Sequence, residues 1–199
     1  LMQTLIRKIL TARVYDVAIE SPLDSMPRLS DRMHNRILLK REDLQPVFSF
    51  KLRGAFNKIT SLDRAALERG IICASAGNHA QGVALAAKRL GIRAVIVMPN
   101  TTPPIKVQSV RGFGGEVVLH GDAFDEAYQH ARMLEQQQGL SFIHPYDDLE
   151  VIAGQGTIGV EILRQHPDPI HAVFIAVGGG GLISGVSAYI KFLRPDIRI

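Results

Sequence analysis

The amino-acid sequence predicts an α/β protein built on open parallel sheets. In the middle of the chain, short apolar segments alternate with longer segments of helical periodicity. This alternation is typical of βαβ units, in which crossover helices join parallel strands. A further apolar segment followed by a helix-like run lies near the carboxyl end. We therefore expect two open parallel-sheet lobes, with a small α/β lobe over residues 68–147 inserted into a large lobe formed by 1–67 and 148–199.

The amino-terminal part is expected to open with a helix on which Leu1, Leu5 and Ile9 share one face, followed by a loop that contains two prolines. The apolar segment 37–39 then leads into the charged cluster 40–43, with sequence KRED. Mixed charges at the end of a strand form ion-paired structural networks more often than catalytic groups. We expect such a network here.

The small lobe has a regular pattern of strands and helices. Three helices are expected, one ending near Gly91, one opened by Pro104 and one capped by Asp122 and ended by Gly139. The segment after this lobe is helix-like over 156–163, and a last helix carries an apolar face. We expect strands at 71–74, 94–98, 116–119, 140–143 and, after the small lobe, 172–177.

The composition is that of an ordinary globular protein, with 46% hydrophobic and 21% charged residues among 199. The net charge is +4, but basic side chains are scattered among acidic ones, so we expect no nucleic-acid partner. No apolar run approaches the roughly 20 residues of a membrane span, so we expect no membrane partner. One cysteine, Cys73, suits a reducing compartment, and the amino end lacks a signal-peptide pattern. These features predict a cytoplasmic protein.

The stretch 49–55, with sequence SFKLRGA, places a lysine between two apolar residues. The apolar residues that follow have helical spacing, so Lys51 is expected on the first turn of a helix with Ser49 as its N-cap. A desolvated lysine loses its proton more readily, and the neutral amine can form a Schiff base with a carbonyl compound. The alternative is an ordinary lysine that buries its stem and extends its charge into water.

Two turns between a strand and a helix are candidate anion sites. The amino end of a helix offers unpaired backbone N–H groups and a partial positive charge. Successive glycines let the backbone wrap closely around a phosphate, although a glycine run can also be a simple tight turn. The first turn contains Ser75, Ala76, Gly77, Asn78 and His79, and the second contains Gly178, Gly179, Gly180 and Gly181, followed by Leu182.

Other motifs carry less weight. The stretch 154–159 matches G-x-G-x-x-G, but it follows no convincing strand and lacks the acidic residue that holds a ribose, so we reject dinucleotide binding there. The seven histidines show no metal-ligand spacing with the single cysteine, and we expect no metal site. No G-x-S-x-G elbow is present.

A desolvated lysine, an anion site with an asparagine and a polyglycine turn together suggest pyridoxal phosphate as cofactor. The stretches 49–55, 75–82 and 178–182 resemble three signatures of the threonine/serine dehydratases, which belong to the tryptophan-synthase-β-like family of pyridoxal-phosphate enzymes, fold type II. The stretches 40–47 and 111–116 look closest to the biosynthetic branch. The resemblance covers nearly the whole chain.

The resemblance implies a role for each motif. Lys51 would be the catalytic Schiff-base lysine, with Phe50 packed near the cofactor ring and Asn78 bonded to the ring hydroxyl. The phosphate would be held by the glycine turn, and the substrate carboxylate by the turn after the first strand. The phosphate-binding residues would be Gly178, Gly179, Gly180, Gly181 and Leu182, and the carboxylate-binding residues Ser75, Ala76, Gly77, Asn78 and His79.

The implied reaction is dehydration of L-threonine to 2-oxobutanoate and ammonia, the first step of isoleucine biosynthesis. The implied assembly is a homo-oligomer, a dimer or tetramer. Family members continue past Ile199, so the large lobe is expected to be incomplete at its carboxyl end. Serine dehydratases and serine racemases share the lysine and glycine motifs and remain alternatives. A non-catalytic phosphate- or nucleotide-binding module is the alternative from another class.

Overall fold

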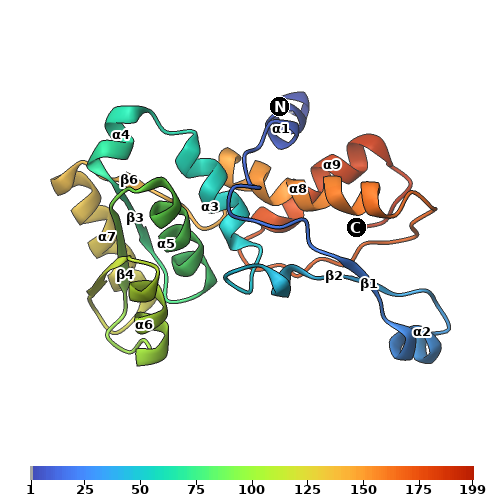
Figure 1. Ribbon diagram of the computed structural model, residues 1–199, viewed down its shortest axis with the longest axis horizontal. Helices are drawn as coiled ribbons and strands as arrows, with labels where there is room; N and C mark the ends of the chain where they lie inside the picture. Colours follow the sequence, from blue (N-terminus) through green and yellow to red (C-terminus); the bar gives the residue numbers. More distant parts are fainter. Residues whose placement is uncertain (1) are drawn as a thin grey trace.

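The structure of the protein is a computed structural model that describes residues 2–199. Two bodies lie side by side, and helix α3 contacts both of them (Figure 1). The first body holds a four-stranded sheet with its helices, and the second is mainly helical. In chain order the elements are α1 (Met2–Leu10), β1 (Leu23–Ser25), α2 (Pro27–Met33), β2 (Leu38–Lys40), η1 (Glu42–Leu44), α3 (Lys51–Thr60), α4 (Arg64–Arg69), β3 (Ile71–Ala74), α5 (Asn78–Leu90), β4 (Ala94–Met98), α6 (Pro104–Gly112), β5 (Glu116–Leu119), α7 (Phe124–Gln138), β6 (Ser141–Phe142), α8 (Leu149–Gln165) and α9 (Gly181–Leu193).

The sheet of the first body is parallel throughout, with strand order β5-β4-β3-β6. Ile71 of β3 aligns with Ala94 of β4 on one side and with Ser141 of β6 on the other. The chain moves outward from β3 to β5 and then returns to the opposite side of β3. The carboxyl ends of β3 and β6 therefore form a topological switch point, where open α/β sheets bind their ligands.

Helices cover both faces of this sheet, as is usual for parallel sheets with uninterrupted apolar strands. Ile71 and Cys73 point toward the layer that contains α3, α5 and α6. Ile72 and Ala74 alternate with them and pack against α7. The α/β class with a parallel sheet is thus confirmed. Strands β3, β4 and β5 have the expected bounds, whereas β6 is shorter than the expected segment 140–143.

The helices of the second body meet at glycines. A Cβ added to Gly154 of α8 would lie 2.6 Å from the Cα of Gly54 in α3. A Cβ added to Gly185 of α9 would lie 2.7 Å from the amide nitrogen of Gly156 in α8. Side chains do not fit at such distances, so only glycine lets these helix backbones touch. The G-x-G-x-x-G match therefore lies inside α8, where its glycines serve helix packing.

Helix α8 begins at Leu149, well before the expected start at residue 156. Its N-cap is Asp148, whose carboxylate accepts the backbone N–H groups of Glu150 and Val151. The expected start was too late by seven residues, because the Asp148 N-cap was not recognised. In the structure the helix continues through glycines 154 and 156, since both are buried at helix crossings.

A short antiparallel pair, β1 and β2, carries helix α2 away from the second body (Figure 1). The loop expected here contains a helix, which corrects the sequence prediction. Pro27 stands at the first helical position, where its fixed φ and missing N–H favour a helix start. His34, with φ 48°, ends the helix in the left-handed conformation.

The strand predicted at 172–177 is not formed. This segment makes one isolated parallel bridge, between Ala172 and Arg198, and Phe174 is 95% exposed. A strand needs a ladder of hydrogen bonds to a neighbour, and residues 2–199 supply only this bridge. Val173 and Ile175 of this segment pack against the cluster of Ile158, Val186 and Ile190, whereas Phe174 between them is exposed.

Three details of the predicted helices also change. The N-cap of α7 is Ala123, not Asp122 as expected. The Glu126 carboxylate accepts the backbone N–H groups of Asp122 and Ala123. On α9, Val186 and Tyr189 are buried as expected, but Leu193 is half exposed. Helix α1 is present with Ile9 buried, and the expected contribution of Leu1 lies outside the described residues. Within residues 2–199, no helix is long and apolar enough to cross a membrane.

Candidate active site

Lys51 is the first residue of α3, and its side chain is half-buried. Its Nζ donates a 2.8 Å hydrogen bond to the carbonyl oxygen of Pro145 and lies 5.5 Å from the ring centroid of Phe50. Burial lowers the pKa of the Lys51 amine. The N-cap of α3 is Phe50, not Ser49 as expected, although the Ser49 hydroxyl accepts the Lys51 backbone N–H at 3.3 Å.

Phe50 packs on the side of α8 and α9. Its ring is half-buried against the apolar cluster that contains Ile158, Val186 and Ile190. Leu182, at the start of α9, packs against the same cluster. Phe50 and Leu182, which are both predicted to contact the cofactor, therefore pack against the same apolar cluster.

The guanidinium of Arg53 is fully buried and fixes the start of α3 to α8. It pairs with Glu161 at 2.6 and 3.0 Å and with Glu42 at 2.8 Å through two bonds. Lys40 and Tyr15 also donate to Glu161. Burial would raise the pKa of Glu161, but the hydrogen bonds and charge of Arg53 outweigh it and the pKa is lowered. Burial, with the nearby Glu161, raises the pKa of Tyr15 to about 12.

The ion-paired network predicted for 40–43 is therefore present, and it reaches further than the sequence indicated. Arg41 pairs with Asp24 at 3.0 Å and with Asp43 at 2.8 Å on the exposed side. Lys40 and Glu42 enter the buried part around Arg53. The network joins the β1–β2 pair to α3 and α8, and so holds the Lys51 helix in place.

The turn 75–79 follows β3 at the switch point of the sheet. The Ser75 N–H donates to the Val97 carbonyl at 3.1 Å, and the Ser75 hydroxyl accepts the Gly77 N–H at 3.2 Å. Helix α5 starts at Asn78, whose side chain is exposed, with Gly77 as N-cap. The N–H groups of its first turn, which have no acceptor within the helix, are available to an anion. Ala76 is half-buried in this turn.

Gly82 brings α5 against the Lys51 helix. A Cβ added to it would lie 3.0 Å from the amide nitrogen of Leu52 and 3.1 Å from the carbonyl carbon of Lys51. A side chain at this position would push the two helices apart. The predicted carboxylate turn and the predicted Schiff-base lysine are thus neighbours.

His79 is buried at the beginning of α5. Its Nε2 lies 2.9 Å from the Ile143 carbonyl oxygen and donates to it, which leaves Nδ1 as an acceptor. That Nδ1 is buried and has no hydrogen-bond partner in the described part of the chain. Burial lowers the pKa of His79 to about 4, so the ring is neutral at physiological pH.

The glycine turn precedes α9 and lies against Tyr146. A Cβ on Gly179 would fall 2.1 Å from the Tyr146 ring, and one on Gly181 would fall 2.9 Å from the Tyr146 carbonyl oxygen. Gly180 has φ 93°, a left-handed conformation that favours glycine. Around Gly178 and Gly180, no atom lies within 4 Å of an added Cβ, so the backbone faces open space there.

The segment 143–146, directly after β6, connects the three predicted motifs. Its carbonyl groups accept from His79 and Lys51, and its tyrosine covers Gly179. Sequence reasoning missed this segment, along with Arg53 and Gly82. The available signal was the parallel sheet, because residues that follow adjacent parallel strands emerge at the same edge.

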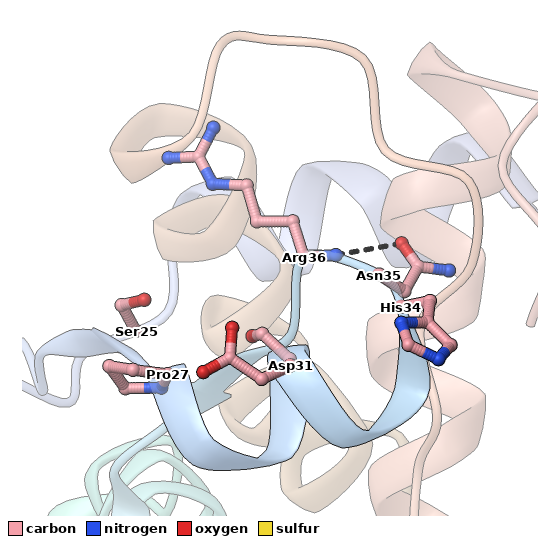
Figure 2. Close-up of a pocket in the computed structure, with 7 residues that line it drawn as sticks. Ser25, Pro27, Asp31, His34, Asn35 and Arg36 are labelled. Atoms are coloured by element: carbon pink, nitrogen blue, oxygen red, sulfur yellow. Dashed lines mark hydrogen bonds between the residues drawn. The ribbon is translucent and has the colours of Figure 1, made fainter.

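A hollow of about 670 Å³ lies elsewhere, beside α2 at the end of the β1–β2 pair (Figure 2). It contains none of the site residues that the sequence predicted. Among residues 2–199, no group of three or more histidine, cysteine, aspartate or glutamate side chains is placed to hold a metal ion. The hollow is lined by Ser25, Pro27, Ser30, Asp31, His34, Asn35 and Arg36.

Comparison with known proteins explains the arrangement. The family model of the pyridoxal-phosphate-dependent enzymes matches residues 14–199. The chain belongs to this family. The expected resemblance to the dehydratases is confirmed, and so is the fold type II class.

Curated relatives of this family member are biosynthetic threonine dehydratases. The enzyme of Burkholderia multivorans is 58% identical over 98% of this chain and 39% of its own length. The chloroplastic enzyme of Arabidopsis thaliana is 58% identical over 96% of this chain and 32% of its own length. The chain therefore spans about a third of the length of these relatives.

Two solved structures show the same fold. The processed form of threonine deaminase isoform 2 from Solanum lycopersicum has a TM-score of 0.96 at 57% identity, covering 98% of this chain and 54% of its own. Maize serine racemase has a TM-score of 0.93 at 35% identity, covering 98% of this chain and 59% of its own. Both structures share the fold of this chain, and the sequence identity is higher to the threonine deaminase than to the serine racemase.

The residues present fit pyridoxal phosphate. Lys51 offers an amine whose only hydrogen-bond acceptor in the described chain is a neutral carbonyl. The glycine turn offers backbone N–H groups with open space at Gly178 and Gly180. The Nδ1 atom of His79, in the turn that follows β3, is a buried acceptor without a partner in the described chain. An aldehyde and a phosphate would find matching groups here.

Proposed function

We propose that this chain is part of a threonine dehydratase that converts L-threonine into 2-oxobutanoate and ammonia with pyridoxal phosphate, the first step of isoleucine biosynthesis. The observation that carries the proposal is the half-buried Lys51 amine, which has no carboxylate partner among residues 2–199 and bonds to Pro145, next to the Tyr146 that contacts the glycine turn. The 58% identity to threonine dehydratases over nearly the whole chain supports the choice of substrate.

In this proposal the residues that hold the cofactor are those expected from the sequence. Lys51 binds its aldehyde, Phe50 packs near its ring, and the Asn78 amide meets the ring hydroxyl. The glycine turn and Leu182 hold its phosphate. The bound cofactor would supply an electron-withdrawing ring that stabilises negative charge developing at the substrate Cα.

The protein groups bind the substrate and move its protons. In the turn from Ser75 to His79, the N–H groups that have no acceptor, those at the start of α5, bind the substrate carboxylate and so orient the Cα–H bond. Lys51 Nζ would accept the Cα proton. Its lowered pKa suits this task, because a neutral amine is needed to act as a base. The β-hydroxyl would leave as water with one added proton, which the protonated Lys51 amine can supply. A water molecule would then hydrolyse the released enamine, by way of its imine, to 2-oxobutanoate and ammonia.

A covalent test follows directly. The purified protein is incubated with pyridoxal phosphate, reduced with borohydride, digested and analysed by mass spectrometry. We expect the pyridoxyl group on Lys51, and the exposed Lys88 of the neighbouring helix to stay unmodified. Modification spread over surface lysines, with Lys51 free, would contradict the proposal.

Serine enzymes are the second candidate, favoured by the TM-score of 0.93 to serine racemase. The candidate activities are threonine dehydration, serine dehydration and serine racemisation. Assays with L-threonine and L-serine separate them when both the keto-acid product and the chirality of serine are measured. We expect the larger kcat/KM with L-threonine. A phosphate-binding module without catalysis would show cofactor binding but no borohydride-trapped lysine.

We further propose a homo-oligomer, a dimer or tetramer, that acts in the cytoplasm and takes an amino acid as its small-molecule substrate. The plant relatives are named chloroplastic, so cell fractionation is the appropriate test of compartment. Light scattering tests the assembly. The division into a lobe of 68–147 and a lobe of 1–67 with 148–199 is supported by two apolar clusters, one around Ile72 and Ala131 and one around Ile158 and Val186, each of which lies within a single lobe. A third cluster joins Phe56 and Ile59 of α3 to the sheet, so α3 packs against the small lobe as well. Limited proteolysis tests the division.

A further inference from the structure

The turn that follows β6 is built on the imidazole of His144. Its Nδ1 accepts the backbone N–H of Tyr146 at 3.3 Å and that of Asp147 at 2.7 Å. A ring nitrogen that accepts two hydrogen bonds carries no proton, so the proton of the neutral ring is on Nε2. The imidazole thus plays the part that an Asn or Asp side chain plays in an Asx turn.

This turn carries two contacts of the candidate active site. The Pro145 carbonyl accepts the hydrogen bond from Lys51 Nζ, and the Tyr146 ring lies against Gly179 of the glycine turn. The rings of His144 and Tyr146 also meet edge to face, with centroids 4.7 Å apart. The state of one imidazole therefore affects the position of the lysine and of the glycine turn together.

We propose that His144 is a positioning residue, whose neutral imidazole holds Lys51 and the glycine turn in the arrangement that receives the cofactor. Protonation at Nδ1 removes the acceptor of both backbone N–H groups and loosens the turn. The part that concerns the cofactor rests on the proposed function above. The part that concerns the turn stands on the hydrogen bonds alone.

The surroundings of His144 keep it neutral near pH 7. Burial lowers the pKa of its half-buried ring, and the charges of Arg132 and Lys51 act in the same direction. Asp147 and Asp148 oppose this effect but are outweighed. His79 of α5 is close enough for the two histidine charges to influence each other, and it is itself neutral because burial lowers its pKa. The ring then becomes charged only below the ordinary histidine pKa of about 6.5.

The test compares three variants with the wild-type protein. In His144→Asn the side-chain oxygen can still accept both N–H groups but does not titrate, whereas His144→Leu removes the acceptor. His171→Asn removes an exposed histidine as the matched control. Two quantities are measured, the tautomer of each imidazole by long-range ¹H–¹⁵N NMR and the Kd for pyridoxal phosphate at pH 8 and pH 5.5.

We expect NMR to show His144 as the Nε2–H tautomer at pH 7.5. From pH 8 to pH 5.5 the wild-type Kd should rise about tenfold more than that of His144→Asn, a change that two lost hydrogen bonds account for. His171→Asn should follow the wild type, and His144→Leu should bind weakly at both pH values.

Two results would overturn the inference. One is an Nδ1–H tautomer or a charged His144 at pH 7.5, which NMR detects without any cofactor. The other is the same pH dependence of Kd in the wild type and in His144→Asn. If no form of the protein traps pyridoxal phosphate, the proposed function fails, and the tautomer still decides whether His144 supports the turn.

Discussion

The Nζ of Lys51 lies 2.8 Å from the carbonyl oxygen of Pro145, a residue 94 positions further along the chain. A carboxylate in that place would raise the pKa of the amine and hold its proton. A carbonyl is a neutral acceptor and leaves burial as the dominant influence, which lowers the pKa of Lys51. The contact therefore orients the amine without keeping it charged.

Replacing Lys51 with alanine should abolish threonine dehydration. Loss of the amine removes both the covalent anchor and the base, so we expect kcat to fall by more than about 10³-fold. The urea unfolding midpoint should change little, because Lys51 makes one hydrogen bond and no ion pair within residues 2–199. Keto-acid release measures the activity, and Lys88→Ala, on an exposed face of α5, is the control. Turnover within tenfold of the wild type would exclude Lys51 as the essential lysine.

Valine in place of Gly179 or Gly180 should weaken cofactor binding more than it slows the chemical step. At Gly179 the new Cβ would meet the Tyr146 ring at 2.1 Å, and at Gly180 a branched side chain would be strained at φ 93°. Strain of this kind is on the order of 1–3 kcal/mol, so Kd should rise by about tenfold or more. Titration of the cofactor gives Kd. Gly112→Val, at an uncrowded position on α6, should bind as the wild type does. Unchanged affinity in both glycine-turn variants would put the phosphate elsewhere.

Replacing Arg53 with methionine should destabilise the fold by about 3–5 kcal/mol, the usual effect of removing one partner from a buried ion pair. Glu161 is fully buried and would keep only Lys40 as a cationic partner. Urea denaturation measures the free energy of unfolding. The matched control is Arg64→Met, which breaks the exposed pair with Glu68 and should have little effect. Equal stability of the two variants would mean that the network around Arg53 contributes little.

His79 should make the free energy of unfolding depend on pH between about 4 and 6.5. Burial lowers its pKa to about 4 in the folded protein, against about 6.5 in the unfolded chain. Between these values the unfolded state binds the extra proton, so stability is complete above pH 6.5 and falls as the pH drops toward 4. The loss approaches about 3 kcal/mol.

The check is urea unfolding of the wild type and of His79→Gln over this pH range. Glutamine can still donate to the Ile143 carbonyl but does not titrate. We expect a shallower pH dependence in the variant, with the difference between the two proteins confined to this interval. Parallel curves would show that His79 is charged in the folded state or exposed to water.

Local patterns in the sequence were enough for most of the small lobe. The strands at 71–74 and 94–98 could be predicted because each is a short apolar run buried on both faces of a parallel sheet. The edge strand at 116–119 could be predicted from its two central valines, although its ends are exposed. The ends at Gly91 and Gly139 followed from the left-handed conformation that glycine adopts at helix ends. The motifs around Lys51, Asn78 and Gly179 were identified from residue type and spacing.

Only the tertiary structure decided which distant residues meet. A strand requires a neighbour, so the apolar run 172–177 has one bridge and no ladder in the described chain, although its sequence is typical of a strand. Closely spaced glycines such as those of α8 occur both at helix ends and where two helices cross. The contact of Gly154 with Gly54 of α3 shows that α8 crosses another helix there. The Lys51 amine, the His79 ring and the glycine turn converge on 143–146 because β6 lies beside β3. Hydrogen bonds and packing between residues far apart in the chain depend on that sheet order, which no local pattern contains.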